Sequence, residues 1–364
     1  MDSLVIYFFA FICSSIMAGI YQKIRGNKII WIALISLPVF LLQAFRYYVG
    51  TDYKAYISLY YSISLGPNDF YFKRYLREPL YLLQNIITKI IFDDYTGLFI
   101  ITSLVECILI FYIIDYYKDK ISMSLAYFLY YCISFPHFLN AERQGVAAVL
   151  VWLSYRFLEE KKLVKFMICI ILAAMMHNTA IIMISLLVAY YLTKTKVKVK
   201  DNNVRNYFLM CLAIVVVINF RSLFDLLSSL IKPLEKYSIY IYSGWKGMSL
   251  GFVIPYLLVL PFLLLDFFRR NKIFQKKELL YIYYLGCIVI IISAIVDYGN
   301  RVLLYTDFSC ILLICFACKE LVKESKVNWL IKPIYSILGI VYFVSMYYVV
   351  GCDEIFPYNS LLFK

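Results

Sequence analysis

Charged residues are scarce in this sequence. Asp, Glu, Lys and Arg make up 16% of its 364 residues, whereas a soluble domain carries roughly a quarter. Hydrophobic residues make up 63%, and the mean hydropathy is +0.78. This scarcity of charge excludes an ordinary soluble globular domain and indicates a chain surrounded by lipid.

Histidine is scarcer still, with two residues in the whole chain. The ten Cys lie mostly inside apolar runs, and Cys315 and Cys318, although spaced like metal ligands, have no second ligand pair to complete a site. We therefore interpret the thiols as buried side chains. The sequence predicts neither a metal site nor a cofactor.

Internal repeats, low-complexity linkers and a soluble domain are also lacking, so residues 1–364 are expected to form a single membrane-embedded domain. The first apolar run is not preceded by the basic region of a cleavable signal peptide. We expect this run to be retained as the first helix.

Apolar runs are abundant, and many are long enough to cross a hydrocarbon core of about 30 Å. Many of the 36 Tyr lie near the ends of these runs, where aromatic rings sit among lipid headgroups. The pattern predicts an all-α fold, a polytopic transmembrane helical bundle of about twelve spanning helices. The runs cover residues 4–22, 29–45, 97–115, 121–138, 141–158, 163–176, 179–192, 206–220, 251–268, 279–296, 302–318 and 330–350.

The net charge of +13 is concentrated in short connections between these runs. By the positive-inside rule, such connections lie on the cytoplasmic side. Twelve helices with both termini outside satisfy the rule. This distribution favours a role in membrane orientation over nucleic-acid binding. The six basic connections lie near residues 23–28, 118–120, 161–165, 194–205, 269–277 and 319–326.

Two segments decide the predicted topology. Residues 163–192 have basic flanks on both sides, which favours a hairpin turning at His177 and Asn178 over one long helix. Residues 79–92 are apolar but too short to span, so we expect a re-entrant or interfacial helix there. This half-helix belongs to a first outer loop at 46–96, and a second outer loop is expected at 221–250.

The first outer loop begins with Arg46, followed by Gly50 and Asp52. A guanidinium at a membrane exit can bind phosphate through its planar fork of donors. The alternative is an interfacial Arg that snorkels among tyrosines. Gly50 allows a sharp turn, and Asp52 is near enough in sequence to orient Arg46.

Farther along this loop, Arg77 and Glu78 precede Pro79. Proline suits the first position of a helix, which would leave the Glu78 carboxylate at the helix N-terminus. For the cations of this segment, which include Lys73 and Arg74, the alternative is a solvated anchor for the half-helix.

Arg143 and Gln144 lie at the outward start of the fifth apolar run, after Asn140 and Glu142. Asn140 suits a helix N-cap, and Glu142 suits the positive end of the helix dipole. A cation such as Arg143 is mildly unfavourable at that position. Its presence therefore favours a functional role.

Three further positions carry candidate groups. His177 lies in the predicted hairpin turn, where an imidazole suits proton transfer near neutral pH, although a turn histidine is more often a satisfied polar residue. Asp297 and Arg301 flank a glycine turn, which a simple ion pair would also explain. Glu106 lies in the middle of an apolar run, where an ionisable group is costly and is either functional or hydrogen-bonded between helices.

In order and spacing, this set resembles the EpsG-like branch of the O-antigen and exopolysaccharide polymerases (Wzy). The resemblance spans nearly the whole chain and rests on residues 46–53, Glu78-Pro79, Arg143-Gln144, His177 and Arg301. It implies a glycosyltransferase-type polymerase in the bacterial inner membrane. Such an enzyme joins oligosaccharide repeat units, carried on undecaprenyl pyrophosphate, into O antigen, capsule or exopolysaccharide at the periplasmic face. The implied partners are this lipid-linked oligosaccharide, membrane lipid, a chain-length regulator and a flippase.

In such a reaction, a sugar hydroxyl of the acceptor attacks the anomeric carbon of the donor and releases undecaprenyl pyrophosphate. Arginines at the outer helix ends would hold the pyrophosphate and stabilise its charge. Asp52, Glu78 and His177 compete for the role of general base. The residues expected to contact the pyrophosphate are Arg46, Arg77, Arg143, Gln144 and Arg301.

Two other functions stay open. A flippase or transporter of the same lipid-linked oligosaccharide predicts internal symmetry and charges at mid-depth, whereas this sequence has no repeat and few deep charges beyond Glu106. An O-antigen ligase would use the same donor and differ only in its acceptor.

Overall fold

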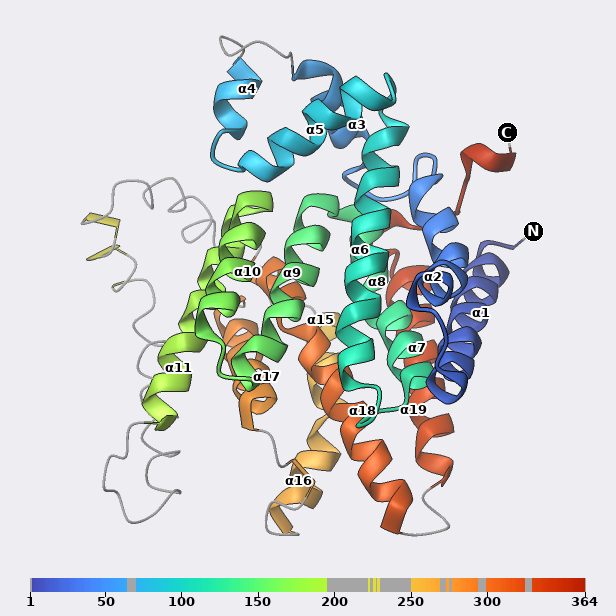
Figure 1. Ribbon diagram of the computed structural model, residues 1–364, viewed down its shortest axis with the longest axis vertical. Helices are drawn as coiled ribbons and strands as arrows, with labels where there is room; N and C mark the ends of the chain where they lie inside the picture. Colours follow the sequence, from blue (N-terminus) through green and yellow to red (C-terminus); the bar gives the residue numbers. More distant parts are fainter. Residues whose placement is uncertain are drawn as a thin grey trace.

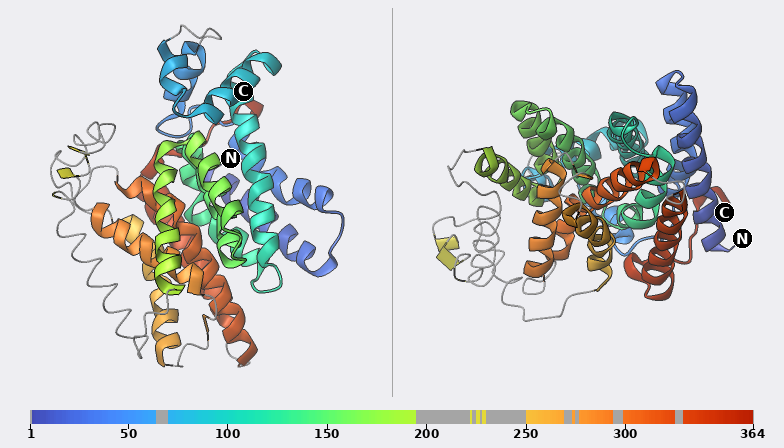
Figure 2. Two further views of the ribbon diagram at one scale, coloured as in Figure 1. Left: turned by 60° about the vertical axis from the view of Figure 1, so that its left-hand side comes forward. Right: turned by 90° about the horizontal axis from the view of Figure 1, so that it is seen from below.

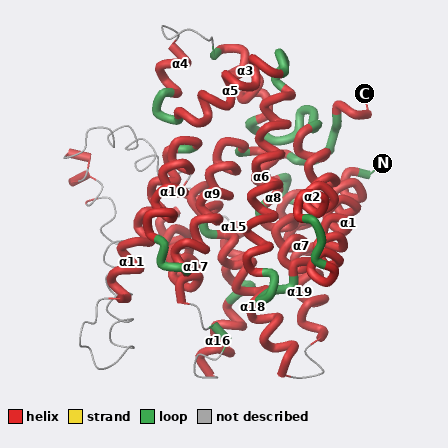
Figure 3. The backbone as a smooth tube through the Cα atoms, in the orientation of Figure 1, coloured by secondary structure: helices red, strands yellow, loops and turns green. Residues whose placement is uncertain are grey.

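All regular structure in the described residues of the computed structural model is helical (Figure 3). Among these residues, β contact is limited to one isolated bridge between Arg46 and Ser360. The predicted all-α fold is therefore confirmed for this part of the chain. The described residues are 2–63, 70–194, 250–268, 273–274, 277–293, 299–324 and 329–363, with five single residues between 222 and 229.

The elements follow one another as labelled in Figure 1. The first ten helices are α1 (Ser3–Ile24), α2 (Lys28–Ala44), α3 (Tyr53–Ser62), α4 (Phe70–Tyr75), α5 (Pro79–Ile91), α6 (Thr96–Tyr117), α7 (Met123–Ile133), α8 (Phe135–Asn140), α9 (Glu142–Glu159) and α10 (Leu163–Met176). The chain continues with η1 (Asn178–Ile184), α11 (Ser185–Lys194), α15 (Leu250–Leu257), α16 (Leu260–Phe268), α17 (Lys277–Ser293), η3 (Gly299–Tyr305), α18 (Asp307–Glu324), α19 (Ile331–Phe343), η5 (Val344–Val349), η6 (Cys352–Glu354) and η7 (Leu361–Phe363).

Four helical segments are long and apolar enough to cross a membrane by themselves. They are Ser3–Ile24, Thr96–Tyr117, Gly251–Phe268 and Ile331–Val349, and further apolar helices of 10–17 residues lie among the described residues. Apolar side chains such as Phe9 of α1 and Ile29 of α2 face outward, 65% and 76% exposed, as expected for lipid-facing positions. The protein is a membrane protein, and the number of about twelve spans stays a prediction.

Helix α9 packs against α6 and α10 (Figure 2). Trp152 of α9 stacks on Phe308 of α18, with ring centroids 4.6 Å apart, and on Phe138 of α8 at 5.5 Å. Gly145 lets α6 approach closely, because a Cβ atom there would lie 2.5 Å from Glu106 Oε1. These contacts fix the start of α9 against its neighbours.

The bundle has two distinct polar ends. Helices α6 and α9 run in the same direction, since Glu106 contacts Gly145 near the start of α9 and Tyr117 donates a 2.8 Å hydrogen bond to Glu159 at its end. A helical rise of 1.5 Å per residue places these levels roughly 20 Å apart. We call them the Glu78 end and the Asp115 end, after the carboxylate that each one holds.

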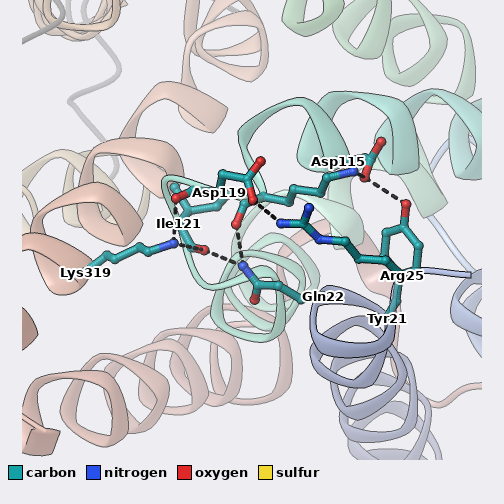
Figure 4. A network of polar contacts seen from close by, with 8 residues as sticks. Tyr21, Gln22, Arg25, Asp115, Asp119, Ile121 and Lys319 are labelled. Carbon is teal, nitrogen blue, oxygen red and sulfur yellow. Dashed lines mark hydrogen bonds and ion pairs between the residues drawn. The ribbon is translucent and has the colours of Figure 1, made fainter.

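The Asp115 end is closed by a network between α1, the α6–α7 connection and α18 (Figure 4). Asp115 accepts hydrogen bonds from Tyr21 at 2.9 Å, Lys28 at 2.7 Å and Lys118 at 2.7 Å. Gln22 donates to the carbonyl of Ile121 at 2.7 Å and accepts from the Met123 N–H at 3.0 Å. This network ties α1 and α18 to the connection between α6 and α7.

At the opposite end, α3, α4 and α5 form a cap that projects beyond the bundle (Figures 1 and 2). Pro79 is the first residue of α5, as the sequence predicts. Leu83, Ile87 and Ile90 expose one apolar stripe at helical spacing, while Tyr81 and Asn85 are buried on the other face. This amphipathic pattern is that of a helix lying along a membrane surface.

The segment 163–192 is broken at His177, whose φ of −150° and ψ of 115° are extended. Helix α10 ends at Met176, and η1 begins at Asn178. The chain therefore interrupts its helix where the sequence predicts a hairpin turn. The predicted second outer loop at 221–250 lies almost entirely outside the described residues, as does Asp297.

Candidate functional site

The candidate site is organised by the break between α8 and α9. Ala141 has φ −104° and ψ 65°, which ends α8 at Asn140 and starts α9 at Glu142. The first turn of α9 therefore presents Glu142 and Arg143 in different directions. Glu142 faces the interior, where its side chain is 1% exposed, whereas the Arg143 side chain is 24% exposed.

Arg143 pairs with Glu78, the residue that precedes α5. Its Nη1 lies 2.6 Å from Glu78 Oε2. Tyrosine rings surround the guanidinium, with the centroids of Tyr56, Tyr75 and Tyr81 at 5.9, 5.4 and 5.0 Å. This aromatic surround strengthens the cation's attachment and joins the cap to the start of α9.

The second oxygen of Glu78 faces the α10–η1 turn. The Asn178 N–H donates to Glu78 Oε1 at 3.1 Å, and His177 Nδ1 lies 3.2 Å from the same oxygen. Burial by itself would raise the pKa of Glu78, but the His177 contact, the charge of Arg143 and the Asn178 N–H together hold that pKa below its usual range. Glu78 is consequently a carboxylate at neutral pH.

The η3 segment completes this side of the site. Gln144 donates to the carbonyl of Arg301, and Trp152 donates to that of Leu304 at 3.1 Å. Tyr305 shares a 2.8 Å hydrogen bond with Thr179, two residues beyond His177. The first turns of α9 thus hold η3 beside the His177 turn.

Arg46 lies deeper than the sequence suggests. Its side chain is fully buried, Nη2 lies 2.7 Å from Glu142 Oε1, and Nη1 donates to the Gln43 carbonyl at 2.6 Å. The guanidinium also lies 4.1 Å from the centroid of the Phe99 ring. Glu142, rather than Asp52, orients Arg46. Gln43 donates in turn to the buried Glu106, so the mid-depth carboxylate is hydrogen-bonded between helices.

Asp52 belongs to a neighbouring cluster instead of the Glu78 pair. It is the N-cap residue of α3, and its N–H donates to Asn140 Oδ1 at 2.8 Å. The turn before it needs Gly50, because φ there is +97° and a Cβ atom would lie 2.4 Å from the Leu139 carbonyl. Asp52 is thereby fixed against the end of α8.

The two remaining candidate cations are exposed. Arg77 precedes Glu78 directly and belongs to the cap. Arg301 is exposed at the start of η3, and its positive charge contributes to the lowered pKa of Asp353. The structure thus brings Glu78, Arg143, Gln144, His177 and the Arg301 backbone together at one end of the bundle. Arg46 joins them through Glu142.

Sequence reasoning missed the tyrosines around Arg143, Tyr305 of η3 and an Asp353–His137 pair. The tyrosines are too numerous to single out by composition, and Asp353 lies more than 200 residues from its partner. Only His137 gave a signal, as one of two histidines. Within the described residues, no group of three or more His, Cys, Asp and Glu side chains is arranged to hold a metal ion.

Comparison with known proteins places the chain in one family. Neither a curated protein nor a solved structure matches it. The model of the EpsG family, however, matches residues 28–360, which includes Glu78, Asp115 and all the candidate residues named above. Such a match indicates a polysaccharide polymerase-type role. The chain belongs to the EpsG family.

Proposed function

We propose that this protein joins oligosaccharide repeat units, carried on undecaprenyl pyrophosphate, into a long surface polysaccharide. The observation that carries the proposal is the assembly of Glu78, Arg143 and His177 from three distant segments at one end of a membrane bundle. Family membership supports the polymerase class. The chemistry of the three side chains supports glycosyl transfer from a lipid pyrophosphate.

The charge distribution supports an outward-facing site. Described residues of the basic connections, including Lys28, Lys118 and Lys319, contact the Asp115 end. The positive-inside rule assigns that end to the cytoplasm. The Glu78 end then faces the periplasm of a bacterial inner membrane, with α5 lying at the depth of the lipid headgroups.

The donor pyrophosphate needs cations at this depth. Arg143 is partly exposed, and Arg77 and Arg301 are exposed nearby. In the proposed mechanism these three guanidinium groups hold the pyrophosphate by charge-assisted hydrogen bonds and stabilise the charge of the departing group. Arg46 has a different task, because its buried ion pair with Glu142 fixes the start of α9.

His177 is the base in this mechanism. Glu78 lies beside Nδ1 and favours the tautomer that leaves Nε2 to accept a proton. The acceptor hydroxyl loses its proton to Nε2 as its oxygen bonds to the anomeric carbon. The bond from that carbon to the pyrophosphate oxygen breaks, and undecaprenyl pyrophosphate leaves with the electron pair. Glu78, already ionised and paired, orients the base.

The experiment replaces Arg143 in a strain that lacks the chromosomal gene. Arg143→Ala is expected to leave single repeat units and no polysaccharide ladder on a gel, because donor binding loses its cation. Arg156→Ala is the matched control, since Arg156 lies on the same helix at the Asp115 end, 4.8 Å from the Tyr116 ring. The control should keep a full ladder. A full ladder with Arg143→Ala would refute the proposed site.

A further inference from the structure

A second polar centre lies beside the Glu78 site, formed by His137 of α8 and Asp353 of η6. His137 Nδ1 lies 2.6 Å from Asp353 Oδ2, and Asn140 donates to Asp353 Oδ1 at 2.8 Å. The two side chains of the pair are 16% and 15% exposed, so both reach the surface of the protein. None of these three residues has a part in the proposed donor chemistry.

The backbone around Asp353 adopts a conformation that side chains disfavour. Asp353 has φ of 61° and Glu354 has φ of 50°, in the left-handed region that is uncommon for residues other than glycine. Hydrogen bonds from Gly50 N to the Glu354 carbonyl and from Thr51 N to the Asp353 carbonyl, both 3.1 Å, hold it there. Such strain persists where surrounding structure fixes it, and it gathers at functional sites.

This centre is close to the donor site. Arg143 follows His137 by six positions in the sequence, a span of at most about 20 Å even when fully extended. Arg301 is near both, because its carbonyl accepts from Gln144 while its charge lowers the pKa of Asp353. The two centres therefore share one exposed arginine as a neighbour.

The groups gathered here suit sugar hydroxyls. The Asp353 carboxylate faces His137 through one oxygen and accepts from Asn140 through the other, and each carboxylate oxygen has a further lone pair that can accept from a sugar hydroxyl. Aromatic rings line the same place, with Phe252 stacked on His137 at 5.9 Å and the Tyr347 hydroxyl 3.2 Å from His137 Nε2. A few convergent polar groups on an aromatic wall are typical of small-molecule sites.

We propose that His137 and Asp353 bind the acceptor oligosaccharide and position its hydroxyl for attack. The proposal rests on the polymerase function proposed above. A transfer between two oligosaccharides needs a place for each of them, and the two neighbouring centres near Arg301 provide these places. Asp353 accepts a hydrogen bond from an acceptor hydroxyl, and Asn140 keeps the carboxylate oriented.

The test measures transfer by purified protein in nanodiscs. The donor is the host's lipid-linked repeat unit, and the acceptor probe is the same oligosaccharide without its lipid, varied in concentration. Asp353→Asn should raise the KM for the soluble acceptor about tenfold, equivalent to one charge-assisted hydrogen bond. The kcat and the affinity for the donor should change by less than about threefold. His137→Gln should act in the same direction.

A second bond of the C-terminal segment provides the control. Tyr358 donates to the Leu42 carbonyl at 3.1 Å and holds the same segment without reaching the polar pair. Tyr358→Phe should leave the acceptor KM unchanged. If Asp353→Asn does not fold, His137→Gln decides the question. An unchanged acceptor KM in the folded variant refutes the acceptor site, whereas absence of any transfer by the wild-type protein refutes the polymerase function itself.

Discussion

The two ends of the bundle hold their carboxylates in different ways. Asp115 accepts from Tyr21, which is 94 residues away, and from two lysines, Lys28 and Lys118 (Figure 4). Glu78 instead meets Arg143 and the Asn178 N–H, which are 65 and 100 residues away. Both carboxylates therefore join segments that are distant in sequence. Asp115 is held by a phenol and two ammonium groups, whereas Glu78 also lies beside the imidazole of His177. The first arrangement is an ion-pair clamp, and the second can orient a base.

Both ends hold buried side-chain nitrogens without an aligned hydrogen-bond partner. Within the described residues these include Arg143 Nε and His177 Nδ1 at the Glu78 end and Arg156 Nε at the Asp115 end. Such atoms are uncommon in folded proteins and call for a specific explanation. In the proposed mechanism the Arg143 Nε–H donates to the pyrophosphate, whereas His177 Nδ1 faces Glu78 and Nε2 takes the proton.

The largest expected effect tests whether Arg46 stabilises the fold or binds the substrate. Arg46→Ala leaves the buried Glu142 carboxylate without its partner, which should lower the free energy of unfolding by about 3–5 kcal/mol. Unfolding in detergent measures the change. Arg46→Met combined with Glu142→Leu should recover most of the loss, because an apolar pair of similar volume needs no charge compensation. A stable Arg46→Ala protein that binds donor weakly would instead make Arg46 a pyrophosphate ligand, as the sequence predicts.

A matched pair of carboxyl-to-amide changes compares the two ends directly. Glu78→Gln should lower the polymerisation rate about 100-fold, because a misplaced base costs that much, while the protein stays folded. Asp115→Asn should lower the free energy of unfolding by about 1.5–3 kcal/mol and leave the rate per folded molecule unchanged. The polymerisation rate is measured in nanodiscs, and the free energy of unfolding is measured in detergent. If both variants lose stability but keep the wild-type rate per folded molecule, Glu78 only holds helices together, as Asp115 does.

Much of this comparison could be predicted from local sequence. The start of α5 follows from Pro79, and the break at His177 follows from basic flanks on both sides of 163–192. The positions of Glu78, Arg143 and His177 were singled out because each side chain is unusual in its local context. Local context failed at Asn140, which was predicted as the N-cap of α9 but is the last residue of α8, with Ala141 at the N-cap position.

Partners over long distances could not be predicted. Asp52 lies six residues from Arg46, yet Arg46 pairs with Glu142, 96 residues away, because α2 and the first turn of α9 meet inside the bundle. Asp353 pairs with His137 for the same reason. One sequence carries no signal of such packing, so the chemistry of the second polar centre became visible only in three dimensions.

The smallest effect concerns pH. Because the folded pKa of Glu78 is lowered from its ordinary value of 4.5, its ion pair contributes stability above that value and loses it as the pH falls through the folded pKa. The difference in melting temperature between wild type and Glu78→Gln should therefore be constant from pH 7 to about pH 5 and shrink in stronger acid.

Glu160→Gln is the control at the Asp115 end. The pKa of Glu160 is also lowered, chiefly by its hydrogen bond with Lys162, but the Lys162 side chain is 52% exposed, and an exposed pair contributes about 0–1 kcal/mol. The difference in melting temperature between wild type and Glu160→Gln should therefore change less with pH than the difference for Glu78→Gln. A larger acid dependence for Glu160 than for Glu78 would mean that solvent reaches the Glu78 pair freely, and that the cap does not shield it.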